Sequence, residues 1–208
     1  VIPNGYLWQT VNMGGGLQTW IAYDPLTSKW LFNLTDVPST GTIAYTEKGE
    51  IVKYILNYNT NTKTGWLALW NWTAAPTAAA GLPGSGSNAL QFRPVGKNIN
   101  CSTAYSWNKT FSGDLIGNQA PAFVYVLPGD IILGRSSAIT AGVFSTRGTP
   151  DPYTVWAMNL KDGQEGQILW KKSYAAPSGN ASRTLGPLDP VNRVWTMTDA
   201  ESMQWLGY

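Results

Sequence analysis

The sequence predicts an all-β chain of about four antiparallel sheet units. Composition is the first reason: the 208 residues include 22 glycines, 13 prolines, 11 tryptophans and 10 tyrosines, whereas only 12% are charged. Turn-forming and aromatic residues at this density are typical of short strands joined by tight turns. No stretch shows sustained helical periodicity, so we expect little or no α-helix.

A short aromatic element recurs four times along the chain and sets the repeat length. In each copy a Phe or Trp is followed by a polar residue, any residue, and a residue with a hydroxyl group. Successive copies are 38, 37 and 63 residues apart, which indicates a unit of about 40 residues with one late insertion. That length fits one small antiparallel sheet per repeat, so the aromatic residues are predicted to pack between neighbouring sheets. They are Phe32, Trp70, Trp107 and Trp170.

Apolar alternation and turn sequences divide the first half of the chain into two sheet units. Turns are predicted at the glycine run 14–16, at 24–28, at 47–50 and at 59–65. The segment from Ala74 to Ser87 is rich in Ala, Pro, Gly and Ser and is interpreted as an exposed loop. The strands predicted for these two units are 6–9, 19–23, 29–34, 42–46, 51–58 and 66–72.

The second half gives a third unit, a fourth unit and one more hairpin. Pro128-Gly129-Asp130 is a strong turn sequence and fixes the hairpin between its two neighbouring strands. The third unit is predicted to hold strands 104–107, 123–127 and 131–134. The fourth is predicted to hold strands 143–145, 153–160 and 167–174, with turns at 149–152 and 161–166. Strands 193–197 and 202–206 then open a fifth unit.

A longer pattern surrounds three of these turns, roughly Ala-X-Asp-X-X-Thr-Gly-X-X-X-Trp. The first copy keeps the spacing, with Ala22 to Ser28 followed by Phe32. The second copy has Asn57, Thr64-Gly65 and Trp70, and the third has Ala157-Met158-Asn159, Asp162-Gly163 and Trp170. This pattern resembles the β-propeller repeats of quinoprotein-like proteins. In particular, the phrases TGWLALWN and SMQWLGY are similar to those in repeats of large secreted archaeal surface glycoproteins.

The resemblance implies a partial β-propeller, with residues 1–208 forming a single array of blades that is incomplete at both ends and belongs to a longer chain. Open sheet faces at the two ends are then expected to bind further repeats of the same chain or other copies of it. Quinoproteins of this fold bind pyrroloquinoline quinone at the hub of a complete ring, with a Trp platform, a cation and commonly a disulfide of neighbouring cysteines. With Cys101 alone and half a ring, we expect this chain to bind no cofactor.

Asn-X-Ser/Thr acceptor sequences for N-linked glycans occur five times, which points to an extracellular or cell-surface location. The alternative is that Asn and Thr are simply strand-end and turn residues. The weakest acceptor is Asn100, because the middle residue of its triplet is Cys101. The candidate glycosylation sites are Asn33, Asn71, Asn100, Asn108 and Asn180.

The residue types give little support for catalysis or for a charged partner. The chain has no histidine, the commonest general base, and its acidic residues stand mostly beside Gly or Pro as turn-forming acids do. A calcium site at 162–166 would lack ligands. The formal charge of +2 and the absence of an 18-residue apolar run indicate neither nucleic-acid binding nor membrane insertion. We therefore expect no enzyme activity and no metal site.

The function predicted from these observations is that of an extracellular, glycosylated structural or interaction module of a cell-surface or filamentous assembly. One alternative is a carbohydrate- or protein-binding propeller module, because tryptophans beyond the closing aromatics could form a sugar-stacking surface. A second alternative is part of a quinoprotein oxidoreductase. The additional tryptophans are Trp8, Trp20, Trp66, Trp72, Trp156, Trp195 and Trp205.

Overall fold

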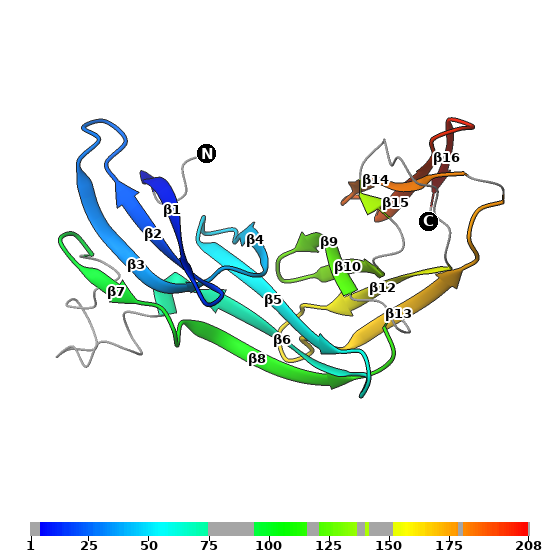
Figure 1. Cartoon of the computed structure of the whole chain (residues 1–208), viewed down its shortest axis with the longest axis horizontal. Helices are drawn as coiled ribbons and strands as arrows, with labels where there is room; N and C mark the ends of the chain where they lie inside the picture. The colour runs from blue at the N-terminus through cyan, green and yellow to red at the C-terminus, as the bar shows by residue number, and fades with distance from the viewer. Residues whose placement is uncertain are drawn as a thin grey trace. The chain divides into compact units, whose positions relative to one another are not determined.

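The computed structural model is all-β and contains four four-stranded sheets (Figure 1). It describes residues 5–74, 94–115, 121–136, 140–141, 152–178 and 181–207. The predicted fold class, about four antiparallel sheet units, is confirmed. Within these residues no helix has the length and hydropathy needed to cross a bilayer.

The first sheet is an antiparallel meander with one added parallel strand. Strands β1 (Leu7–Gly14), β2 (Leu17–Tyr23) and β3 (Trp30–Pro38) pair antiparallel in chain order. The added strand β7 (Asn98–Asn100) runs parallel to β3 at the other edge.

The second sheet has the order β4-β5-β6-β8, from β4 (Thr42–Tyr45), β5 (Ile51–Asn59), β6 (Thr64–Asn71) and β8 (Tyr105–Ser112). A single 3-10 turn, η2 (Trp72–Ala74), follows β6. Although β7 lies between β6 and β8 in the sequence, it pairs in the first sheet. We call this insertion of a strand into the neighbouring sheet strand exchange.

The third and fourth sheets repeat this exchange. The third sheet has the order β13-β12-β10-β9, from β9 (Pro121–Leu127), β10 (Ile131–Ser136), β12 (Tyr153–Asn159) and β13 (Ile168–Tyr174). The fourth holds β14 (Arg183–Asp189), β15 (Val194–Asp199) and β16 (Gln204–Gly207), with β11 (Thr140–Ala141) parallel to β14. In sequence β11 lies between β10 and β12, two strands of the third sheet.

Backbone contacts divide the chain into two compact units. The first comprises residues 1–56 and 67–109, and the second comprises residues 57–66 and 110–208. The first and second sheets meet in the first unit, and the third and fourth sheets meet in the second. Strands β5, β6 and β8 contribute residues to both units.

The predicted third and fourth units are grouped wrongly, and one strand was not predicted. Strand β8, predicted to join the hairpin 123–127 and 131–134, belongs to the second sheet, where the Asn71 amide donates to the Ala104 carbonyl just before it. The hairpin itself pairs with β12 in the third sheet. Strand β14 was not predicted, because it contains Gly186 and Pro187; a register shift between Leu185 and Leu188 accommodates both. The predicted strand 143–145 and residues 75–87 of the predicted loop lie outside the described residues.

A recurring turn joins the antiparallel strands and is the most regular repeat in the structure. Asp24 Oδ1 accepts the amides of the residues two and three further on, both at 2.8 Å. Asn59 and Asp189 bind their turns in the same way. The second copy of the sequence pattern is therefore anchored on Asn59 rather than on Asn57. Because these bonds favour the charged carboxylate, they hold the pKa of Asp24 below its ordinary value. The pKa of Asp189 is lowered first by the hydrogen bond from the Asn192 side chain and then by the two turn amides.

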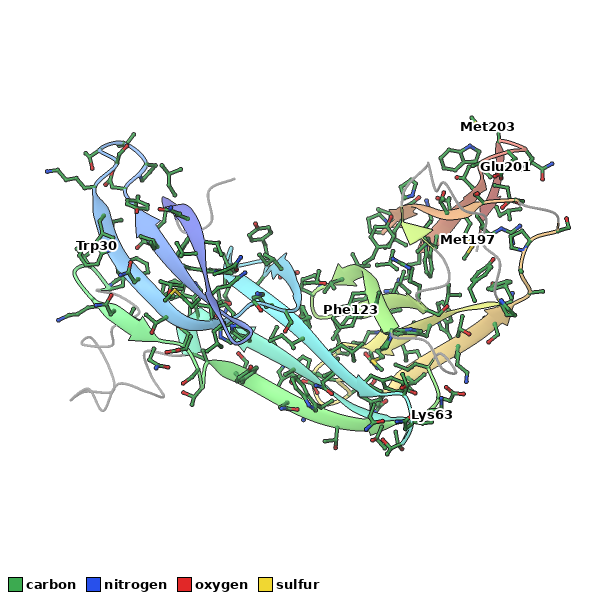
Figure 2. All side chains as sticks on the ribbon, viewed as in Figure 1. Trp30, Lys63, Phe123, Met197, Glu201 and Met203 are labelled. Atoms are coloured by element: carbon green, nitrogen blue, oxygen red, sulfur yellow. The ribbon has the colours of Figure 1, made fainter. Side chains whose placement is uncertain are left out.

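The residue four positions after each of these turn residues has a left-handed backbone. These residues are Ser28, Lys63 and Arg193, with φ of 55°, 55° and 57°. Met203, four positions after Asp199, has the same conformation with φ of 55°. Figure 2 shows Lys63 and Met203 at hairpin tips. At one of these positions, Arg193, the side chain reaches Asp130 in the hairpin of the third sheet.

Aromatic side chains fill the space between the first and second sheets. The Trp20 and Trp70 ring centroids are 5.5 Å apart, and Phe32 stacks on Trp72 at 5.8 Å. The third and fourth sheets pack mainly through aliphatic and sulfur-containing side chains around two aromatic rings. This second core contains Leu133, Tyr153, Val155, Ala157, Leu185, Trp195 and Met197.

The packing of Trp156 against Gly134 gives a stability prediction. The two residues face each other on β12 and β10, and a Cβ at position 134 would overlap the fully buried indole. We expect Gly134→Ala to lower the free energy of unfolding by about 1–3 kcal/mol, because Trp156 must leave its rotamer. Urea denaturation measures the loss.

Gly207→Ala is the matched control, since a Cβ at position 207 would meet only Val194 Cγ1 at 3.6 Å, an ordinary contact. Equal urea midpoints for Gly134→Ala and Gly207→Ala would contradict the overlap at position 134.

Candidate binding surfaces and modification sites

The four predicted packing aromatics differ in burial according to the position of their strand in its sheet. Phe32 and Trp70 lie on the inner strands β3 and β6 and are fully buried. Trp107 lies on the edge strand β8, half-buried against Tyr54 of the same sheet. Trp170, on the edge strand β13, is 41% exposed. Packing between sheets is thus seen for Phe32 and Trp70, whereas Trp170 borders a pocket.

The partners of Phe32 and Trp70 were not assigned from the sequence. Trp72 stacks on Phe32, and Trp20 packs edge-on against Trp70. Trp8 contacts Phe32, Trp20 and Trp72. Side chains alternate between the two faces of β1, so Trp8 lies on the face opposite to Leu7 and Gln9. This alternation is the signal that could have placed Trp8 on the inner face.

Lys53 is an unexpected charge at this aromatic interface. It is 2% exposed, its Nζ lies 5.7 Å from the Trp20 ring centroid, and it donates to the Pro38 carbonyl. Burial lowers the pKa of Lys53 from 10.5 to about 8. Protonation of this amine therefore makes the stability of the first unit depend on pH.

An inter-sheet pocket of about 320 Å³ lies between the third and fourth sheets, inside the second unit. Aliphatic side chains make up most of its wall, and two indoles complete it. One indole, Trp195, is only 3% exposed, and its Nε1–H has no acceptor among the described residues. The lining residues are Leu127, Ile131, Leu133, Leu169, Trp170, Leu188, Arg193 and Trp195.

Arg193 supplies the charged group of this pocket. Its left-handed turn position sends the side chain across to the hairpin of the third sheet, where Nη2 lies 3.0 Å and 3.2 Å from the two carboxylate oxygens of Asp130. No other hydrogen bond of the guanidinium occurs in the described part of the chain. The charges of Arg193 and Asp130 cancel, while their remaining N–H groups and carboxylate lone pairs can still form hydrogen bonds.

The first sheet has an uncharged outer face on which apolar side chains are interspersed with Gln9 and Thr19. Alternation places Leu7 and Val11 with Ile21 and Tyr23 on the face opposite to the buried indoles. Met13, at the hairpin end, is 64% exposed. Residues 7–23 contain no charged side chain. We call this surface, made by β1 and β2, the outer face of the first sheet.

The candidate glycan acceptors are not equally accessible. Asn108 is exposed on β8, and Asn33 and Asn100 retain exposure although each amide donates at 2.7 Å, to Asn98 and Asp36 respectively. Asn71 is 9% exposed, and its Oδ1 accepts the Thr73 amide and hydroxyl. A glycan does not fit at Asn71 in the folded sheet. Asn180 lies outside the described residues.

Chemistry-bearing residues are dispersed in the described ranges. No group of three or more His, Cys, Asp or Glu residues could hold a metal ion there. Asp162, in the turn 162–166, belongs to no such group. Cys101 is buried as a free thiol, and burial, aided by the charge of Asp36, raises its pKa to about 12. Within the described ranges, this set of residues does not fit a metal-assisted quinone site.

No protein-family model matches the chain, and no curated protein matches it.

Burial predicts which acceptor sequences are occupied when the chain is secreted from a eukaryotic host. Folded, secreted material should carry glycans at Asn33 and Asn108 and none at Asn71, because a glycosylated Asn71 cannot enter its sheet position. Glycopeptide mapping of the monodisperse fraction measures the occupancy. A glycan at Asn71 in folded protein would contradict the position of β6.

Lys53 gives a prediction for the pH dependence of stability. Between pH 8 and pH 10.5 the unfolded amine holds a proton that the folded amine has lost, so the free energy of unfolding rises with pH in this window. The expected gain is on the order of 2 kcal/mol. Chemical denaturation across the window measures it.

Lys53→Met should lack this gain. The comparison is made against wild type at each pH, because the Cys101 thiol acts oppositely: its raised pKa stabilises the fold below pH 9 and loses that effect as pH rises toward 12. Parallel curves for wild type and Lys53→Met would refute the assignment.

Proposed function

We propose that the chain is an interaction module of an extracellular, glycosylated assembly, at a cell surface or in a filament. The observation that carries the proposal is the outer face of the first sheet, which is uncharged and exposes Leu7, Val11, Met13 and Leu17. Contiguous apolar surface of this kind is typical of protein interfaces. The module would bind a second copy of itself there.

The two faces of the same sheet differ in how much apolar surface they bury. Its aromatic side chains are buried against the second sheet, whereas Leu7, Val11, Met13 and Leu17 of the outer face remain exposed. Full burial of an aliphatic or Met side chain contributes roughly 1.5–3 kcal/mol. Covering four such side chains therefore supplies several kcal/mol toward association.

The edge strand β1 favours a second copy as the partner. It presents eight residues without a charge, so two β1 strands can pair antiparallel across a two-fold axis without repulsion. Two other long edge strands carry like charges that oppose self-pairing, with Lys109 on β8 and Lys171 and Lys172 on β13, whereas β9 is uncharged but begins at Pro121. Pairing through β1 would also join the outer faces of two copies into one apolar surface.

Exposed acceptor sequences support the extracellular part of the proposal. Asn33 and Asn100 lie near the β3–β7 edge of the first sheet, and Asn108 lies on β8. Asn33 pairs with Ile21 and therefore points to the outer face, beside β2, so the surface left uncovered by glycans is the part of this face nearest β1.

The test is the oligomeric state of the chain in solution. Wild type should self-associate with rising concentration in sedimentation velocity, and Val11→Lys should shift it to monomer, since two paired β1 strands would then each bury a charge. Ser173→Lys, on the exposed edge β13, is the matched control and should associate like wild type. A strictly monomeric wild type, or unchanged association of Val11→Lys, would overturn the proposal.

A further inference from the structure

Strands β5, β6 and β8 lie side by side in the second sheet (Figure 1), and aromatic contacts identify one of its two faces. The Tyr58 and Phe111 rings stack with their centroids 6.1 Å apart, and a Cβ at Gly65 would meet the Phe111 ring. These three residues, one from each strand, therefore share a face. Because side chains alternate along a strand, their neighbours in the sequence point to the opposite face.

The opposite face contains a hollow of about 520 Å³, which we call the polar hollow. Both neighbours of Tyr58 on β5 line it, whereas Tyr58 itself does not, and this difference assigns the hollow to that face. Each of the three strands contributes two residues with a polar group, and Gly65 and Phe111 complete the wall. The six residues are Asn57, Asn59, Thr64, Trp66, Thr110 and Ser112.

The polar hollow has hydrogen-bonding groups to offer and no charge. The side chains of Asn57, Thr110 and Ser112 make no hydrogen bond within the described part of the chain. Amide and hydroxyl groups can both donate and accept, as the hydroxyls of a sugar do. A charged ligand would find no opposite charge among the lining residues, so the hollow favours a neutral ligand with many hydroxyls.

Trp66 gives the polar hollow an aromatic surface on the middle strand of the three, β6. The residue is half-buried, so part of its ring is accessible. Its Nε1 makes no hydrogen bond in the described ranges and is not one of their buried unpaired nitrogens, which leaves it open to solvent. Such an indole offers an apolar ring to the C–H groups of a sugar and a donor to one of its hydroxyls.

A candidate glycan acceptor, Asn108, lies on the same face as the polar hollow. It stands two residues before Thr110 on β8, so the two side chains are about 7 Å apart on one face of the strand. The contact of Trp107 with Tyr54 agrees with this assignment, because alternation places Tyr54 on the face of Tyr58. Asn108 is exposed, and Thr110, the hydroxyl residue of its acceptor sequence, itself lines the hollow. A glycan on Asn108 therefore starts beside the hollow.

We propose that the polar hollow holds the N-linked glycan of this chain's own Asn108. The first sugar rings lie over Trp66, and their hydroxyls bind the side chains of Asn57, Thr110 and Ser112. The inference rests on the proposed glycosylated state of the chain. It does not rest on self-association, because the outer face of the first sheet is made by β1 and β2.

The test compares the chain secreted from a eukaryotic host with the same sequence made without glycans in a bacterial host. In ¹H–¹⁵N spectra the Trp66 indole signal, assigned with Trp66→Phe, should shift between the two forms. Asn108→Gln from the eukaryotic host should give the position of the unglycosylated form. Asn33→Gln is the matched control, since it removes another accessible acceptor and should keep the position of the glycosylated wild type.

Site-resolved deglycosylation under native conditions measures the same contact by its rate. Peptide-N-glycosidase should release the Asn108 glycan at least about fivefold faster from Trp66→Ala than from wild type, the effect of losing one aromatic contact. The Asn33 glycan should leave both proteins at the same rate, which also shows that Trp66→Ala is folded.

Three results would overturn the proposal: an unoccupied Asn108 in the folded, secreted chain, a Trp66 signal that is the same with and without glycans, or equal release of the Asn108 glycan from wild type and Trp66→Ala. A Trp66 signal that moves only when free mannotriose or chitotriose is added would also overturn it and would assign the polar hollow to an external sugar. Sedimentation velocity of the unglycosylated chain still tests self-association, so the two proposals fail separately.

Discussion

The aromatic contact between the first and second sheets is the interaction on which the first unit depends. Trp70 is its centre: the ring packs on Trp20, and Nε1 donates to the Cys101 carbonyl at 3.1 Å. The Cys101 amide in turn donates to the Thr35 carbonyl of β3. One indole of the second sheet therefore fixes the backbone immediately after β7, which helps to hold this strand in the first sheet while β6 before it and β8 after it belong to the second.

Local features of the sequence were sufficient to predict strands and turns, whereas strand exchange was not predictable. The turn at Asp24 can be recognised because the side chain itself makes the turn hydrogen bonds. The parallel pairing of β7 with β3 depends on residues more than 60 positions apart, such as Asn33 and Asn98, and has no local signal. Strand β14 was missed for a different reason, because its Gly186-Pro187 pair reads as a turn until a bulge is allowed.

The candidate sites show the same division. The sequence identified Trp170 as an important aromatic residue, yet its environment depends on the fourth sheet, which provides Trp195 and Arg193 to the pocket. Arg193 could not be recognised from its neighbours, because its role follows from a left-handed turn that directs it toward Asp130. Asn71 has an acceptor sequence as good as that of Asn108, and only burial distinguishes them.

Sheet topology explains why one repeated element serves two purposes. Phe32 and Trp70 are buried because β7 and β8 are added outside their strands, so that a neighbour flanks each aromatic on both sides. No described strand is added outside β13, so Trp170 lacks that flank and keeps an exposed ring. The element that closes an interface on an inner strand thereby opens a pocket on an edge strand. A repeat protein can thus acquire a pocket through the position of a strand, without a new motif in its sequence.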